Sequence, residues 1–362
     1  IYTLSLHDAL PILVISLKNH FNGLPWNEWA QDIKNREEAS MHQYRSELAD
    51  DIEYHNFIQF LFFKQWGDVK RYANENGIKI IGDIPIFVAA DSSDAWANPE
   101  IFLFDEERKP VKVAGVPPDY FSATGQLWGN PLYNWEKLRD TNYNWWVERV
   151  RANLSTCDII RIDHFRGFEA YWAVPYGDDT AINGQWEPGP GIDLFNAIKS
   201  QLGELPIIAE DLGLMTQGVI DLREATGFPG MKILGFAFDS GEENDYLPHT
   251  YTKNCVVYTG THDNDTLIGW FQKAKEEDRQ FARDYLNSRS DDEIHWDAIR
   301  GAWSSVACMA ISPVQDFLGL GSEARINTPG VASGNWQWRL KQGILNDELA
   351  ERIAKLTKIY SR

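Results

Sequence analysis

The chain has 362 residues, 43% of them hydrophobic and 13% aromatic, so it can bury a large core without disulfides or metals to support it. Its formal net charge of −19 disfavours binding to nucleic acid or to anionic membranes, because both depend on clustered Lys and Arg. Composition and charge therefore favour a globular protein that handles uncharged ligands.

Residues 1–12 do not resemble part of a fold. They contain His7 and Asp8, lack the basic start of a signal peptide, and resemble translated read-through of a sequencing adapter. We therefore expect a non-native leader over residues 1–12, a fold that begins at residue 13, and a natural amino end that is missing from this chain.

Three cysteines, Cys157, Cys255 and Cys308, lie far apart and within apolar stretches. An odd number of scattered cysteines favours free, buried thiols in the reducing cytoplasm over a disulfide framework. The sequence holds no run of 18 apolar residues, so it offers no membrane-spanning segment.

Apolar side chains recur at helical spacing over residues 41–76, which predicts one or two amphipathic helices. The stretch that follows, residues 78–86, is short and rich in isoleucine, as in a buried parallel strand. A helix followed by a buried strand is typical of α/β folds.

Five more segments of the same kind are predicted as strands: residues 157–163, 206–211, 231–238, 255–261 and 306–311. The intervals between them leave room for helices, so the pattern predicts a (β/α)8 TIM-type barrel with six of its eight strands. We expect the first two strands to be missing, which would leave open edges near Ile80 and Val306 and a poorly soluble, inactive chain.

Two segments interrupt this alternation and are rich in Gly, Pro, Trp and Tyr. Residues 90–146 and 171–193 are predicted as long inserted loops, and loops of that length in a compact domain tend to be functional. Residues 13–362 are thus predicted to form one incomplete catalytic barrel with two insertions.

Acidic residues stand at or just past several predicted strand ends: Asp83, Asp163, Glu210, Asp239 and Asp263. In a barrel the carboxyl ends of the strands carry the active site, so these side chains are expected to converge. Retaining glycoside chemistry needs one ionised carboxylate as nucleophile and one protonated carboxyl as acid, about 5 to 5.5 Å apart. Asp163 and Glu210 suit these roles.

Neighbouring residues suggest which of the two carboxyls is the nucleophile and which is the general acid. Arg161 stands two residues before Asp163, on the same face of a strand, and a guanidinium there would keep Asp163 ionised. Glu210 follows an apolar run and has no basic neighbour in sequence, so its pKa could rise toward that of a general acid.

Each motif alone has a structural interpretation. Asp163 could cap a helix or form a strand-end salt bridge, and Glu210 could lie in a solvated turn. The His262–Asp263 pair could fix a tautomer or form half of a metal site. No third ligand of suitable spacing accompanies that pair, so we expect no metal and no cofactor.

The motifs together resemble those of the α-amylase superfamily in order and spacing. They are RIDHFRGF at residues 161–168, AEDLG at 209–213 and THDN at 261–264. The segments GDIPIFV at 82–88, 115–133, NTPG at 327–330 and GNW at 334–336 resemble the amylomaltase branch, the 4-α-glucanotransferases. The resemblance runs from about residue 13 to the end.

This resemblance implies an enzyme that transfers α-1,4-glucan segments between maltooligosaccharide, starch or glycogen chains. It implies Asp163 as nucleophile, Glu210 as acid/base and Asp263 as the third carboxylate. Substrate contacts are implied for eight further residues: Asp83, Tyr120, Phe121, Trp128, Arg161, His164, Phe236 and His262. Tyr120 and Phe121 fall on the family's aromatic loop over the acceptor.

Family members carry further residues at the amino end, including the first two barrel strands, which puts the activity of this chain in doubt. A hydrolase of the same superfamily would use the same three carboxylates, so hydrolysis stays an alternative to transfer. A catalytically silent glucan-binding fragment is the third hypothesis.

Overall fold

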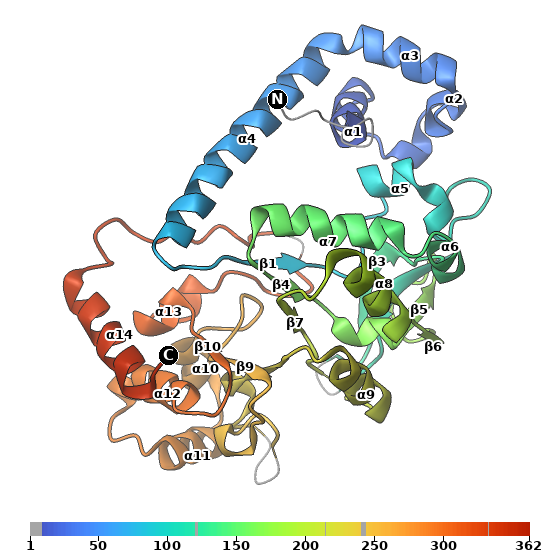
Figure 1. Cartoon of the computed structure of the whole chain (residues 1–362). Helices are drawn as coiled ribbons and strands as arrows, with labels where there is room; N and C mark the ends of the chain where they lie inside the picture. The colour runs from blue at the N-terminus through green and yellow to red at the C-terminus, as the bar shows by residue number, and fades with distance from the viewer. Residues whose placement is uncertain (1–8, 120–121, 214, 240–243, 332) are drawn as a thin grey trace. The chain divides into compact units, whose positions relative to one another are not determined.

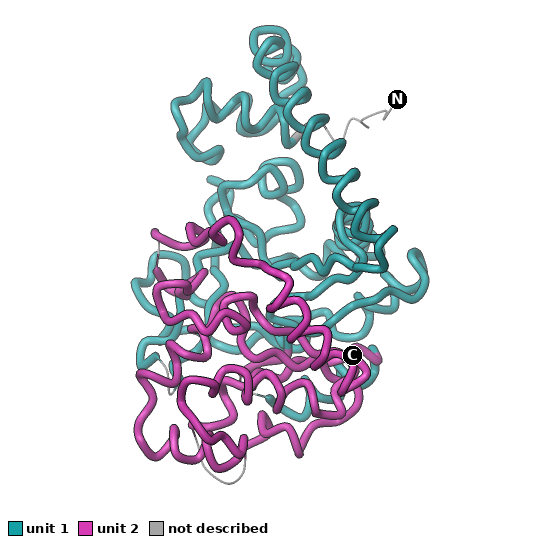
Figure 2. Tube along the Cα trace, turned by 90° about the vertical axis from the view of Figure 1, so that its left-hand side faces the viewer, with its two compact units in different colours: residues 1–210, 215–226 teal, residues 211–214, 227–362 magenta. Residues whose placement is uncertain are grey.

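The structure is a computed structural model that describes residues 9–119, 122–213, 215–239, 244–331 and 333–362 (Figure 1). The chain divides into two compact units (Figure 2). Unit 1 comprises residues 1–210 and 215–226, and unit 2 comprises residues 211–214 and 227–362. Within the described residues, no helix combines the length and apolarity needed to cross a membrane.

Unit 1 is built around a three-stranded parallel sheet of order β1-β4-β7. Its strands are β1 (Ile81–Ile84), β4 (Ile159–Ile162) and β7 (Ile207–Ala209). Every residue of β4 and β7 is buried, which explains why both strands consist mainly of isoleucine.

Helices connect these strands and cover the sheet, as parallel strands require. Helix α7 (Asn144–Thr156) packs on β1 and β4 and against α8 (Ile192–Leu202), which contacts α9 (Gln217–Thr226) (Figure 1). Trp146, Phe165, Phe168 and Phe195 bury their rings in this layer at centroid distances of 5.3 to 6.1 Å.

The two segments predicted as long loops are instead largely structured and form one antiparallel sheet. Its order is β3-β2-β5-β6. The strands are β2 (Lys112–Val116), β3 (Gln126–Pro131), β5 (Ala170–Pro175) and β6 (Gln185–Pro188). Helices α5 (Ser93–Ala97) and α6 (Trp135–Asp140) also lie within the first segment, so both predicted insertions contain regular secondary structure.

Between residue 9 and β1, the structure has four α-helices: α1 (Ala9–His20), α2 (Gln31–Lys34), α3 (Glu38–Glu47) and α4 (Ala49–Glu75). The prediction of one or two helices over residues 41–76 is confirmed, with Leu48 between α3 and α4. Helix α1 starts inside the stretch predicted as a leader, and its residue Ile12 is buried. None of the 27 residues of α4 is buried.

Unit 2 contains the second parallel sheet, of order β10-β9-β8. Its strands are β8 (Gly230–Ile233), β9 (Cys255–Tyr258) and β10 (Met309–Ile311). The strand predicted over residues 231–238 ends at Ile233, because the chain continues as the 3-10 helix η4 (Leu234–Phe236).

The described part of unit 2 also holds five α-helices, and its core lies between β9 and the buried face of α12. They are α10 (Leu267–Lys273), α11 (Glu276–Leu286), α12 (Ile294–Trp303), α13 (Val314–Phe317) and α14 (Asp347–Tyr360). The other 3-10 helices of the chain are η1 (Trp26–Glu28), η2 (Pro99–Ile101), η3 (Phe165–Phe168), η5 (Pro248–Thr250), η6 (Asp291–Glu293) and η7 (Ser322–Ala324).

The predicted α/β class is confirmed, and a parallel strand stands at each of the six predicted places. Closure of these strands into a barrel stays a prediction. Cys157, Cys255 and Cys308 are free thiols, but Cys308 is exposed rather than buried as expected.

Candidate active site

Arg161 joins two carboxylates at the carboxyl end of the first parallel sheet. It stands directly opposite Asp83 in the β1–β4 register, and its Nη1 lies 2.7 Å from both carboxylate oxygens of Asp83. The same nitrogen lies 2.9 Å from Oδ1 of Asp163, two residues farther along the chain. The predicted contact between Arg161 and Asp163 is therefore confirmed, and Asp83 shares it.

The guanidinium is buried, whereas both aspartates remain partly exposed. Burial alone would lower the pKa of Arg161, but the negative charges of Asp83, Asp163 and Glu210 outweigh it and raise that pKa. Arg161 thus carries a permanent positive charge in a poorly solvated position. The charge of Glu210 also acts on Arg161. Both proposed catalytic carboxyls therefore interact with the same guanidinium, although only Asp163 is its neighbour in sequence.

Glu210 directly follows β7 and is only 9% exposed. Its Oε2 accepts a hydrogen bond of 2.6 Å from the backbone N–H of His164, and its carbonyl accepts one of 2.9 Å from the N–H of Phe165. These bonds fix the Glu210 side chain against the turn that carries Asp163.

His164 adopts a left-handed backbone conformation, with φ of 50°, as the residue before the 3-10 helix η3. Burial, with a smaller effect from the positive charge of Arg166, lowers the pKa of His164 to about 3, so the imidazole is neutral at pH 7. Trp128 of β3 meets it edge-on with ring centroids 4.8 Å apart. The structure thus brings these two predicted residues together.

Unit 2 holds a second group of predicted residues around Asp263. His262 Nε2 lies 3.2 Å from Oδ2 of Asp263, and Asn327 donates a hydrogen bond of 2.5 Å to Oδ1. Arg325 donates to the carbonyl oxygen of Asp263 at 2.7 Å, and the N–H of Asn327 donates to that of His262 at 3.2 Å. Segment 325–327 therefore fixes the orientation of the Asp263 carboxylate.

Two aromatic residues of unit 2, Phe236 and Trp336, lie in segments that sequence reasoning singled out. Phe236, a predicted substrate contact, lies in η4 and packs edge-on against Tyr246 at 5.4 Å. Trp336 is 58% exposed, and its ring centroid lies 5.1 Å from that of His262. Trp336 belongs to the GNW motif, but no substrate contact was predicted for it. Tyr120 and Phe121 lie outside the described residues.

Sequence reasoning assigned no role to Arg325 and Asn327, and it missed Asp265 and Asp316. The NTPG motif that begins at Asn327 was a usable signal for the first pair. No local pattern marks Asp316, because its contacts come from residues about 50 positions earlier in the chain.

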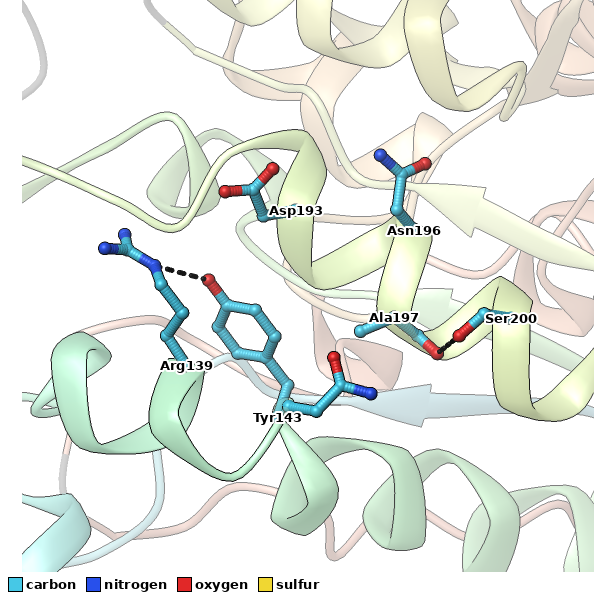
Figure 3. Close-up of a pocket in the computed structure, with 7 residues that line it drawn as sticks. Arg139, Tyr143, Asp193, Asn196, Ala197 and Ser200 are labelled. Carbon is cyan, nitrogen blue, oxygen red and sulfur yellow. Dashed lines mark hydrogen bonds between the residues drawn. The ribbon is translucent and has the colours of Figure 1, made fainter.

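A separate polar pocket of about 360 Å³ in unit 1 is lined by α8, the end of α6 and the turn that follows α6 (Figure 3). It is lined by Arg139, Asn142, Tyr143, Asp193, Asn196, Ala197 and Ser200. The Arg139 side chain donates a 3.5 Å bond to the Tyr143 hydroxyl across this pocket. None of the predicted site residues that the structure describes lines it, so the pocket is distinct from the carboxylate cluster.

The clusters hold the chemical groups that glycosyl transfer requires: carboxylates at strand ends, a buried cation beside them, and aromatic rings nearby. A family model described as 4-alpha-glucanotransferase matches residues 5–346. The chain is 53% identical to a 4-alpha-glucanotransferase of Clostridium butyricum, over 97% of this chain and 72% of that protein.

Two further comparisons agree with this match. A 4-alpha-glucanotransferase of Thermus thermophilus is 48% identical over 97% of this chain and 71% of its own length. The solved structure of an amylomaltase from Streptococcus agalactiae in complex with acarbose superposes with a TM-score of 0.95 at 40% identity, covering 98% of this chain and 72% of that one.

Proposed function

The chain belongs to the 4-alpha-glucanotransferase family, and we propose that it moves α-1,4-linked glucan segments between oligosaccharide chains by a retaining double displacement. The observation that carries the mechanism is the buried Arg161 bound to Asp163, with Glu210 fixed against the adjoining turn. Maltooligosaccharides and starch- or glycogen-like glucans are the proposed substrates.

In the first step, Asp163 attacks the anomeric carbon while Glu210 gives its proton to the leaving glycosidic oxygen. The chain on the leaving side departs with a free 4-hydroxyl, and the other part stays bound to Asp163 as a glycosyl ester. In the second step, Glu210 takes the proton of an acceptor 4-hydroxyl, which attacks the anomeric carbon and releases Asp163. Asp163 and Glu210 thus return to their starting states.

The other predicted residues are assigned supporting roles. Arg161 stabilises the negative charge of Asp163, and Asp83 holds Arg161 in place. His164, Trp128, Phe236 and His262 are proposed to contact sugar rings and hydroxyls, and Tyr120 and Phe121 to cover the acceptor. Asp263 is proposed to bind sugar hydroxyls, with Asn327 keeping one of its oxygens in place.

Two coarser proposals accompany the mechanism. The six parallel strands and their connecting helices support a (β/α)8 barrel fold. The three free thiols support a reducing compartment such as the cytoplasm.

Incubation with maltotriose tests the function. Transfer yields glucose together with maltotetraose and longer chains, whereas hydrolysis raises reducing ends without lengthening any chain. Asp163→Asn should reduce turnover to below about one per cent of the parent rate, because the nucleophile is lost. Asp179→Asn is the matched control, since Asp179 is an exposed aspartate outside the carboxylate cluster, and it should keep the parent rate.

A mixture that gains reducing ends but contains no oligosaccharide longer than maltotriose would exclude the transferase function in favour of hydrolysis. An Asp163→Asn variant that kept more than a few per cent of the rate would leave the function intact but remove Asp163 from the mechanism.

A further inference from the structure

The segment that carries His262 and Asp263 runs from the end of β9 to the start of α10, and one buried carboxylate binds both of its ends. The hydroxyl of Thr259, directly after β9, donates a 2.6 Å hydrogen bond to Oδ2 of Asp316. The backbone N–H of Leu267, the first residue of α10, donates a 2.9 Å bond to Oδ1. Each oxygen of Asp316 therefore fixes one end of segment 259–267.

Asp316 is itself held rigidly. It lies in α13, two residues after the helix begins, and is only 2% exposed. The strand before it is also tied to the segment, since the N–H of Thr259 donates to the carbonyl of Ile311 at 3.2 Å. Burial of a carboxylate is unfavourable unless donors compensate it, so a buried Asp with one donor on each oxygen is a specific feature rather than chance packing.

The residues that follow α13 hold the middle of the same segment. Ser322 donates to Oδ2 of Asp265 at 2.7 Å, Arg325 to the carbonyl of Asp263 at 2.7 Å, and Asn327 to Oδ1 of Asp263 at 2.5 Å. Asp316 fixes the ends and these three residues fix the centre. Residues within 316–327 thus hydrogen-bond to both ends and to the centre of segment 259–267, which carries Asp263.

We propose that Asp316 is a positioning residue for glucan transfer, which fixes the orientation of His262 and Asp263 by binding both ends of their segment. This inference rests on the proposed role of Asp263 and extends it to a residue that does not touch the substrate. Its mechanism is geometric, because displacing a catalytic group by about 1 Å can cost on the order of 100-fold in rate.

The test is a double-mutant cycle between Asp316 and Asp263, measured as kcat and KM for maltotriose disproportionation. Asp316→Ala should lower kcat about 10- to 100-fold with little change in KM, because we expect a misplaced Asp263 to weaken its contacts to the sugar hydroxyls mainly in the transition state. On an Asp263→Asn background the same substitution should lower the residual kcat by less than about twofold. Non-additivity of this size shows that Asp316 acts through Asp263.

Two conservative variants address folding. Asp316→Asn keeps an acceptor for Leu267 and can donate to the Thr259 hydroxyl, so it should recover most of the lost kcat. Thr259→Val removes only one of the two bonds and should show a smaller loss than Asp316→Ala. Ile299→Ala is the control for destabilisation, because Ile299 is fully buried in the core of unit 2, and its kcat per folded molecule should be unchanged.

The outcomes separate the positioning role of Asp316 from the proposed role of Asp263. Full additivity of Asp316→Ala and Asp263→Asn, or a loss of kcat in Ile299→Ala equal to that in Asp316→Ala at matched melting temperature, overturns the positioning role. Parent-like activity in Asp263→Asn alone overturns the proposed role of Asp263 instead.

Discussion

Arg161 illustrates how one residue can set the chemistry of a strand end. Its guanidinium binds Asp83 and Asp163 at once, and Glu210 adds to the negative charge around it. A lysine would be a poor substitute, because a buried ammonium group loses its proton more readily than a guanidinium does. The charge balance of the whole cluster therefore depends on a single side chain.

Glu210 can be tested by changing how much help the leaving group needs. Glu210→Gln should lower kcat for maltotriose about 100- to 10,000-fold, because the amide cannot protonate the leaving oxygen. The fluoride of an α-glucosyl fluoride donor departs without being protonated, so the first step with this donor should be slowed far less. Burst-phase release of fluoride measures that step. Equal losses with both donors would exclude Glu210 as the general acid.

His164 gives a prediction about stability and pH. Its folded pKa of about 3 lies below the ordinary value of 6.5, so the unfolded chain binds the proton first as pH falls. The protein should therefore lose stability relative to His164→Asn between pH 6.5 and pH 3, by on the order of 1.5 kcal/mol between pH 6.5 and pH 5. Asparagine is the suitable replacement, because it tolerates the left-handed backbone.

Urea unfolding of the parent and His164→Asn at pH 7.5, 6.5 and 5 measures this difference. A constant difference across the three pH values would mean that His164 titrates normally in the folded protein.

At the scale of elements, helix α4 is unusual because it carries many large apolar side chains although none of its residues is buried. Phe57, Phe60 and Phe63 are each more than half exposed. Replacing Phe57 and Phe63 by Gln should therefore change the free energy of unfolding by less than about 0.5 kcal/mol each, and it should reduce light scattering on warming.

Phe168→Ala is the contrasting variant, since Phe168 is fully buried and its truncation should cost about 3 to 5 kcal/mol. Comparable destabilisation by the α4 substitutions would show that this face is covered in solution.

Strands that are buried along their whole length were among the elements that sequence predicted well. Strands β4 and β7 are buried along their whole length, so a run of β-branched residues is their necessary signature. Strand β3 was missed because it contains a glycine and a proline, and its stability comes from pairing with β2 rather than from its own propensity. Local pattern does not report such pairing.

The same limit applies to the site. The acids at strand ends could be predicted, because strand identity and chain direction place Asp83 and Asp163 at one edge of a sheet. The hydrogen bonds that orient Asp263 could not, since their donors come from residues about 60 positions later. A helix of only four residues carries Asp316, which is too short to leave a periodic signal.

At the scale of the whole molecule, the antiparallel sheet also constrains the order in which the chain folds. Strand β2 pairs with β5, so forming this sheet closes a loop of residues 117–169 that contains β4 and the proposed nucleophile. Closing a flexible loop of that length costs about 3.5 kcal/mol of chain entropy beyond a constant, whereas helix α7 forms from contacts that are local in sequence. We therefore expect amide protons of β2 and β5 to gain protection later than those of α7 during refolding, as pulsed hydrogen exchange would measure. Helix α7, which packs on β4, would then be in place before the antiparallel sheet closes.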